Sequence, residues 1–121
     1  MKILFIDDER DPGCYRSVKY RERLGLRYFT EQELEILRKR PQEDVARNYD
    51  EAINLLSNNQ YDLVFFDHDL GENSKSGMDV AKWVVSNIKI PFLFYSHSAN
   101  SVGRENITSL LTQYKDIKCN Y

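Results

Sequence analysis

Acidic residues and histidines directly follow short apolar runs at three places in the sequence. Asp7 and Asp8 follow the run ILFI, and Asp67 and His68 follow the run DLVFF. His97, the second of only two histidines, follows the run PFLFYS. Clustered carboxylates repel one another unless a proton or a cation relieves the charge, and imidazole exchanges a proton near neutral pH. The pattern indicates a metal site, acid–base chemistry, or both.

The acids favour a divalent cation with oxygen ligands. Asp7, Asp8 and Asp67 would converge if their apolar runs are neighbouring strands, and oxygen ligands with room for water suit Mg²⁺ or Mn²⁺. Two alternatives stay open: the acids cap loops or helices, or the histidines join them in a mixed site for a softer metal such as Zn²⁺. His68 and His97 are the candidate acid and base, and Asp69 is placed to orient one imidazole.

A possible anion site follows the last apolar run, in the segment SANSVGRENI. Gly103 and other small residues surround the expected start of a helix, where unpaired N–H groups and the positive dipole end attract anions. Arg104 adds a guanidinium that can hold a phosphate in a bidentate manner. Asn100 either caps this helix or binds substrate, and Ser98 offers a hydroxyl beside it.

These residues can meet only if strands and helices alternate along the chain. Each apolar run is too short for a helix and too apolar for a half-exposed strand, which predicts strands buried on both faces. Capping boxes, Thr30 with Glu33 and Ser76 with Asp79, begin two of the helices, and Asp50 is the expected cap of another. The expected strands are 3–7, 62–67 and 91–96, with weaker candidates at 44–48 and in the tail 116–121. The expected helices are 31–40, 51–58, one that follows Ser76, and one that begins near Asn100 or Ser101.

Alternation with short links predicts an α/β domain in the doubly wound class, with a mostly parallel sheet of four or five strands. Ligands bind such sheets at the carboxyl ends of the strands, where the acids and histidines lie. We expect a single domain over 1–121. The segment 12–29 is expected to be an irregular basic insertion after the first strand, and the loop 71–77 a flap over the site.

Composition excludes several classes of function. The 121 residues are 41% hydrophobic and 30% charged, with a formal net charge of -2. That balance fits a globular domain and gives no overall attraction to duplex DNA or to an anionic membrane. No apolar run has the roughly 20 residues of a membrane span, and the N-terminus does not resemble a signal peptide. We therefore expect a cytoplasmic protein in which Cys14 and Cys119 are reduced thiols.

The acidic pair Asp7–Asp8 and the position of Asp67 resemble the receiver domains of two-component signalling. The resemblance implies a flavodoxin-like sheet, Mg²⁺ held by these three side chains and the backbone carbonyl of Asp69, and Asp67 as the phosphoacceptor. The lysine expected after a fifth strand has no clear counterpart, and Ser96 and Ser98 both qualify as the expected hydroxyl residue.

A closer resemblance covers most of the chain. FIDDERDPG, DLVFFDHDLGENSKSGMDVAKWV and HSANSVGRENI are similar to three motifs of the cyclic-phosphate processing receiver domains, with Ser101 in place of a proline. The resemblance implies metal-dependent processing of a cyclic phosphate on a nucleotide or an RNA end. Two alternatives stay open: a receiver that is phosphorylated on Asp67 and acts through a partner, and a protein that binds a cyclic nucleotide without cleaving it.

Overall fold

Three apolar segments and the more polar β2 form one parallel sheet in the computed structural model, in the order β2-β1-β3-β4. The strands are short because an acid, a basic residue or a histidine soon follows each of them. Their bounds are β1 Lys2–Ile6, β2 Gln42–Ala46, β3 Leu63–Phe66 and β4 Leu93–Ser96. The structure describes residues 1–9, 13, 18–70, 75–89, 91–98 and 100–119.

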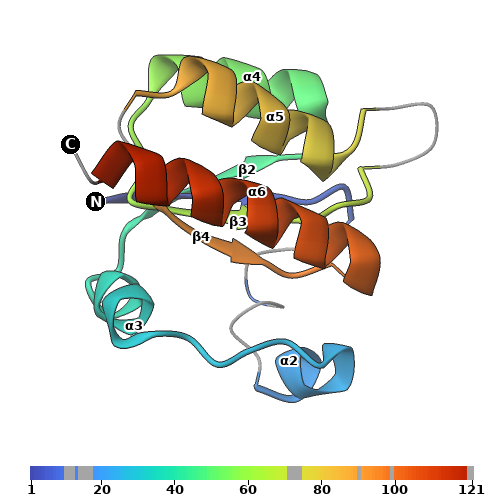
Figure 1. The fold of residues 1–121 in the computed structure, drawn as a ribbon. Coiled ribbons are helices and arrows are strands. Elements are labelled where there is room, and N and C mark those ends of the chain that lie inside the picture. The colour runs from blue at the N-terminus through green and yellow to red at the C-terminus, as the bar shows by residue number, and fades with distance from the viewer. Residues whose placement is uncertain (10–12, 14–17, 71–74, 90, 99, 120–121) are drawn as a thin grey trace.

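Helices cover both faces of the sheet, so the predicted doubly wound α/β fold is confirmed (Figure 1). Helices α4, α5 and α6 lie on one face, and α2 and α3 lie on the other. None of the described helices combines the length and apolar character that a membrane span requires. The helix bounds are α2 Val18–Leu24, α3 Glu31–Arg38, α4 Tyr49–Asn58, α5 Gly77–Asn87 and α6 Ser101–Cys119.

Side-chain alternation along the strands divides the core into two clusters. Even-numbered residues such as Leu4 and Val64 face α4, α5 and α6, and odd-numbered residues face the α3 side. On that second side the strand register aligns Phe5, Phe65 and Tyr95 in one row across β1, β3 and β4. The rings of Phe5 and Phe65 stack at 4.5 Å, and those of Phe65 and Tyr95 lie 5.5 Å apart. We call these three side chains the aromatic row.

The helix ends follow local sequence signals. Both predicted capping boxes are present, at Thr30 with Glu33 and at Ser76 with Asp79. The prediction that Asp50 caps α4 was wrong. The cap is Asn48, whose side-chain oxygen accepts a hydrogen bond from the N–H of Glu51 at 2.9 Å, because the helix begins at Tyr49.

The tail is helical up to Cys119, so the predicted final strand was wrong within the part of it that the structure describes. Ile107, Leu111 and Tyr114 recur at helical spacing and are buried against the sheet. Ile117, which a fifth strand would bury, is 58% exposed. The flavodoxin-like order continues to a fifth strand beside β4. Among the described residues no strand pairs with that side of β4, so β4 is an edge strand.

The basic segment 12–29 was predicted to be irregular. This was wrong for Val18–Leu24, which forms the helix α2. Residues 12 and 14–17, and with them Cys14, lie outside the described residues. The guanidinium of Arg21 lies 4.2 Å from the ring centre of Phe29, which in turn packs against Phe65 and Tyr95 of the aromatic row. The described part of the segment therefore covers the α3 side of the sheet.

Arg27 closes part of the open edge of β4. Its guanidinium donates to the carbonyl oxygen of Phe94 at 3.2 Å and makes two hydrogen bonds to the carboxylate of Glu33, at 2.7 and 2.8 Å. The ion pair with Glu33 raises the pKa of Arg27. The guanidinium carbon of Arg27 also lies 4.5 Å from the ring centre of Tyr95. Burial raises the pKa of the Tyr95 hydroxyl. A charged side chain on an edge strand opposes pairing with other chains.

Replacing Glu33 with Gln tests this contact while keeping a residue that can complete the capping box. We expect Glu33→Gln to lower the free energy of unfolding by about 1–2 kcal/mol, because Arg27 loses its charged partner at a site that is only partly buried. Urea unfolding measures the loss, and Glu31→Gln, at an exposed position two residues earlier in the same helix turn, is the control. Equal stability of both variants would contradict the role assigned to the ion pair.

Candidate functional site

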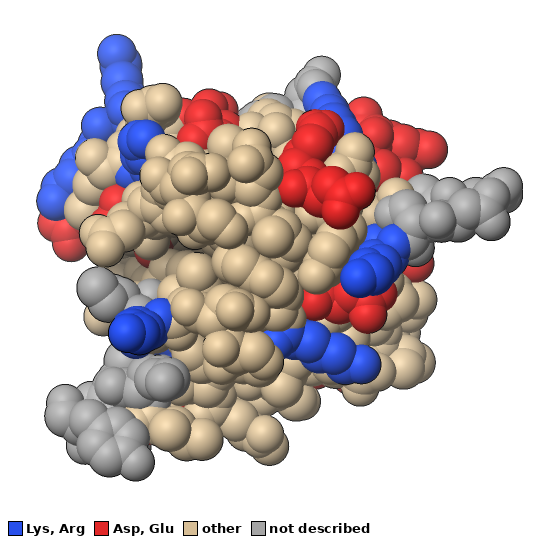
Figure 2. All heavy atoms as spheres, turned by 90° about the horizontal axis from the view of Figure 1, so that it is seen from above, with Lys and Arg blue, Asp and Glu red and all other residues tan. Residues whose placement is uncertain are grey.

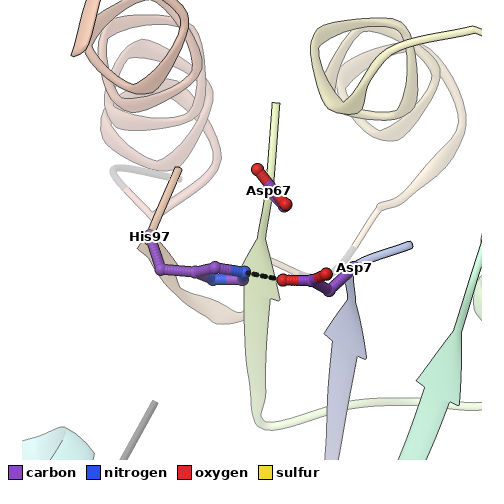
Figure 3. Close-up of side chains that lie close together, drawn as sticks. All are labelled: Asp7, Asp67 and His97. Carbon is purple, nitrogen blue, oxygen red and sulfur yellow. Dashed lines mark hydrogen bonds and ion pairs between the residues drawn. The ribbon is translucent and has the colours of Figure 1, made fainter. Parts of the chain in front are cut away.

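Three side chains meet at the carboxyl ends of β1, β3 and β4. Asp7, Asp67 and His97 each donate their backbone N–H to the neighbouring strand, at 3.0, 3.0 and 2.9 Å, so strand pairing continues up to these residues. They stand two positions beyond the aromatic row and continue its alternation. The sheet register therefore sets the cluster of Asp7, Asp67 and His97, which we call the rim cluster (Figure 3).

The rim cluster is buried and close enough to bind one ion. One ligand atom from each of the three residues lies within 4.8 Å of the other two. Nε2 of His97 lies 3.3 Å from Oδ2 of Asp7, with both side chains fully buried. Asp67 is 3% exposed and points into the same space from the strand between them (Figure 3).

Two buried carboxylates require a positive charge nearby. The guanidinium of Arg47 lies close by, with Nη1 3.4 Å from the backbone oxygen of Asp7, and a divalent cation held by the cluster would add further positive charge. Two carboxylates and one imidazole are an accepted ligand set for Mn²⁺ and Zn²⁺, whereas Mg²⁺ favours oxygen ligands alone. Backbone donors already hold one oxygen of each acid: Glu9 N–H bonds to Asp7 at 2.9 Å, and Asp69 N–H bonds to Asp67 at 3.3 Å. The residues present fit a divalent cation.

Two of the predicted metal residues lie outside this cluster. Asp8 is partly exposed and is not among the ligand atoms that converge. Asp69 is 66% exposed and turns its carboxylate to Nδ1 of His68 at 3.1 Å. The structure thus brings His97 together with two of the predicted acids, and it pairs His68 with Asp69 at a more exposed position.

The beginning of α5 packs very tightly against the backbone that follows β3. Gly77 N–H donates to the carbonyl oxygen of His68 at 2.7 Å. A Cβ at position 77 would lie 2.8 Å from the carbonyl carbon of Asp67 and closer still to its oxygen, so only glycine fits. Sequence reasoning missed Gly77. The available signal was a glycine directly after the capping residue Ser76. Of the predicted flap, 71–74 lies outside the described residues.

The residues predicted to hold phosphate bond to one another in this structure. Asn100 N–H donates to the hydroxyl of Ser98 at 3.0 Å, and the side chain of Asn100 accepts from Gly103 N–H at 3.0 Å, which confirms that Asn100 caps α6. Nη1 of Arg104 donates to the carbonyl oxygens of Ser98 and Leu24, at 2.9 and 3.1 Å. Arg104 thereby fastens the loop after β4 to the end of α2.

A groove of about 410 Å³ lies at the open edge of β4. It runs between the segment after α2 and the outer side of α6. Ser96, the residue before His97, contributes to its wall, and Arg104 stands in the same wall. The hydroxyl of Ser96 is buried and has no hydrogen-bond partner among the described residues. A larger groove of about 870 Å³ contains Asp62 and Leu93, at the opposite end of β3 and β4.

The surface over α4, α5 and α6 carries side chains of both charges, and neither sign dominates it. Acidic and basic side chains stand around a largely uncharged centre (Figure 2). Duplex binding relies on many phosphate contacts from clustered basic residues. Among the described residues of this face, basic side chains do not gather into one patch.

The parallel order β2-β1-β3-β4, with acids at the ends of β1 and β3, defines a receiver-type domain. The family profile described as "Cyclic-phosphate processing Receiver domain" matches residues 2–113. The chain belongs to this family. A search of curated proteins finds no significant match.

Solved receiver structures have the same fold. Response regulator TrrA of Thermotoga maritima, solved in complex with Mg(2+)-BeF, is 25% identical with a TM-score of 0.53, and the match covers 91% of this chain and 79% of that one. The HemR receiver domain of Leptospira biflexa is 27% identical with a TM-score of 0.53, covering 90% and 74%. A CheY-like receiver of Methylobacillus flagellatus is 22% identical with a TM-score of 0.51, covering 80% and 68%.

Replacing Asp67 with Asn tests whether the rim cluster binds a metal. We expect Asp67→Asn to weaken Mn²⁺ binding at least about tenfold, because one charged ligand is lost. Without metal, the same variant should melt at a higher temperature than the wild type, because one of two repelling carboxylates is neutral.

Mn²⁺ titration followed by electron paramagnetic resonance measures the affinity. The control is Asp116→Asn, at an exposed position near the end of α6. Equal Mn²⁺ affinity in both variants would rule out Asp67 as a ligand.

Proposed function

We propose that the protein processes a cyclic phosphate on a nucleotide or an RNA end at the carboxyl rim of the sheet. One observation carries the proposal: Asp7, Asp67 and His97 converge there, and His68 follows directly after Asp67, in a chain of the cyclic-phosphate processing family. A receiver that only accepts a phosphoryl group needs no histidine at this place. Two imidazoles provide for proton transfer in a phosphate reaction.

The two histidines differ in environment, which suggests different roles. His97 is fully buried against Asp7, so it is suited to balancing charge or to holding a cation with Asp7 and Asp67. The side chain of His68 is 25% exposed, so it can exchange protons with water and substrate. Both histidines are candidate acid and base from the sequence, and burial of His97 makes His68 the better candidate for proton exchange.

A hydrolytic step can be written with these groups. A water oxygen attacks phosphorus, the bond from phosphorus to one ribose oxygen breaks, and the ring of the cyclic phosphate opens. His68 accepts the proton of the attacking water, and the same proton then passes to the leaving ribose oxygen, directly or through solvent water. A divalent cation bound by Asp7, Asp67 and His97 would polarise a phosphoryl oxygen and offset its charge. Asp67 as a covalent nucleophile is a variant of this scheme.

The groove at the β4 edge is the proposed place for the nucleoside. Its volume of about 410 Å³ falls within the usual range of small-molecule sites. Arg104 retains Nε and Nη2 as donors after its two bonds to backbone carbonyls, and a phosphodiester is a natural acceptor.

Turnover of defined substrates tests the proposal. We expect hydrolysis of a 2′,3′-cyclic mononucleotide, or of an oligoribonucleotide that ends in such a phosphate, in the presence of Mg²⁺ or Mn²⁺. His68→Ala should lower the rate by roughly 10²–10⁴-fold, the usual contribution of a general acid or base. Chromatography of substrate and product measures the rate, and Asp116→Asn is the control. Full activity of His68→Ala would refute the role of His68, and recovery of tightly bound but intact ligand would show sequestration instead.

A second candidate function is phosphorylation of Asp67. It is favoured by the position of Asp67 after the third strand and by the likeness to TrrA, which was solved with Mg(2+)-BeF. If a small donor such as acetyl phosphate phosphorylates the protein, we expect the Asp67→Asn variant to take up no phosphoryl group and the His68→Ala variant to take it up as the wild type does. Mass spectrometry of the intact protein measures it. Phosphorylation with no cyclic-phosphate turnover would make the receiver function the better account.

A further inference from the structure

The first turn of α6 lies directly against the ring of His68. A Cβ at position 103 would lie 2.8 Å from Nδ1 of His68 and closer still to Cγ and Cδ2. Real Cβ atoms do not approach other atoms this closely. The backbone of Gly103 is not in the left-handed region, so its conformation does not require glycine. Glycine in a helix costs up to about 1 kcal/mol relative to alanine, so close approach is the physical reason for it here.

The helix turn that carries Gly103 is itself held in place. Asn100 caps the N–H of Gly103 at 3.0 Å, and Arg104, the next residue, ties the loop after β4 to Leu24. The backbone carbonyl of His68 is fixed from the other side by Gly77 N–H at 2.7 Å. The backbone of His68 and the helix turn that carries Gly103 are therefore held by separate hydrogen bonds.

The contact with Asp69 decides which ring nitrogen carries the proton. An ionised carboxylate only accepts hydrogen bonds, so the bond of 3.1 Å to Nδ1 requires Nδ1–H. In the neutral ring the lone pair then lies on Nε2. Because Asp69 is 66% exposed, this bond alone would orient the ring loosely. The packing against Gly103 supplies the missing constraint.

We propose that Gly103 is a positioning residue for the reaction. Because Gly103 has no Cβ, the ring of His68 can lie against the helix and bond to Asp69 through Nδ1. Nε2 is then the ring nitrogen that exchanges a proton with substrate. This inference rests on the proposed function for the role of His68. The placement of the ring and its tautomer are measurable without any substrate.

The first test reads the tautomer of His68 by long-range ¹H–¹⁵N NMR. The protein has two histidines, so His97→Gln assigns the signals. We expect Nδ1–H at His68 in the wild type and a shift towards Nε2–H, the tautomer that free histidine prefers, in Gly103→Ala. Gly13→Ala is the matched control, because a Cβ at position 13 meets nothing within 4 Å. An unchanged His68 tautomer in Gly103→Ala would overturn the proposal.

The second test is a double-mutant cycle on melting temperature, which remains informative if Gly103→Ala alone is unstable. We expect Gly103→Ala to lower the melting temperature in the wild type, because Cβ and the ring clash. In the His68→Ala background the same change should raise it by roughly 3 °C, because alanine favours the helix. An equal effect in both backgrounds would overturn the contact with His68.

Turnover separates this inference from the proposed function. If the protein hydrolyses a cyclic phosphate, Gly103→Ala should lower kcat about tenfold or more and leave Mn²⁺ affinity within about twofold, because the rim cluster is untouched. If no substrate is turned over while the tautomer and the cycle behave as expected, the positioning of His68 stands and the proposed reaction fails. Turnover with wild-type kcat in Gly103→Ala would overturn the positioning role.

Discussion

The register of a parallel sheet controls the chemistry available to this protein. Residues that are hydrogen-bonded neighbours in β1, β3 and β4 remain neighbours one step past the strands, so Asp7, Asp67 and His97 must come together. A shift of one residue in any strand would turn its side chain to the opposite face. The aromatic row holds the register, since its rings fill the layer directly beneath the rim cluster. The strand register therefore fixes both the packing of the core and the geometry of the site.

The open edge of β4 is the second feature that distinguishes the structure from the flavodoxin-like order. Where a fifth strand would pair, Arg27 donates to the carbonyl oxygen of Phe94 and is held by Glu33, which also completes the cap of α3. One acid thus connects a helix start, an edge strand and the segment after α2. The groove lined by Phe94, Ser96 and Arg104 lies at this same edge, where a fifth strand would otherwise pair.

Much of the fold could be predicted because the signals are local. Apolar runs that end in acids mark β1 and β3, and the capping boxes at Thr30 and Ser76 mark α3 and α5. The tail was misread because a short stretch with Ile117 fits a strand as well as a helix, and only the buried side of the preceding turns decides for helix. Contacts between distant segments left no local signal. The bond from Arg27 to Phe94 spans 67 residues, and the packing of Gly103 on His68 depends on where α6 meets the loop after β3.

The sequence placed Asp7, Asp67 and His97 among the candidate site residues, but it did not show how the surroundings of the two histidines differ. Sequence position treats His68 and His97 alike, because both follow a strand. The structure separates them by alternation. His97 continues the inward-facing series that includes Tyr95, so it is buried with Asp7, whereas His68 follows the inward-facing Asp67 by one residue and meets Asp69 and Gly103 at the surface. His97 therefore contacts a carboxylate inside the protein, whereas the ring of His68 is partly open to solvent and bonds to an exposed carboxylate. The alternation of side chains at the strand ends thus gives the two imidazoles different surroundings, and the roles proposed for them follow from that difference.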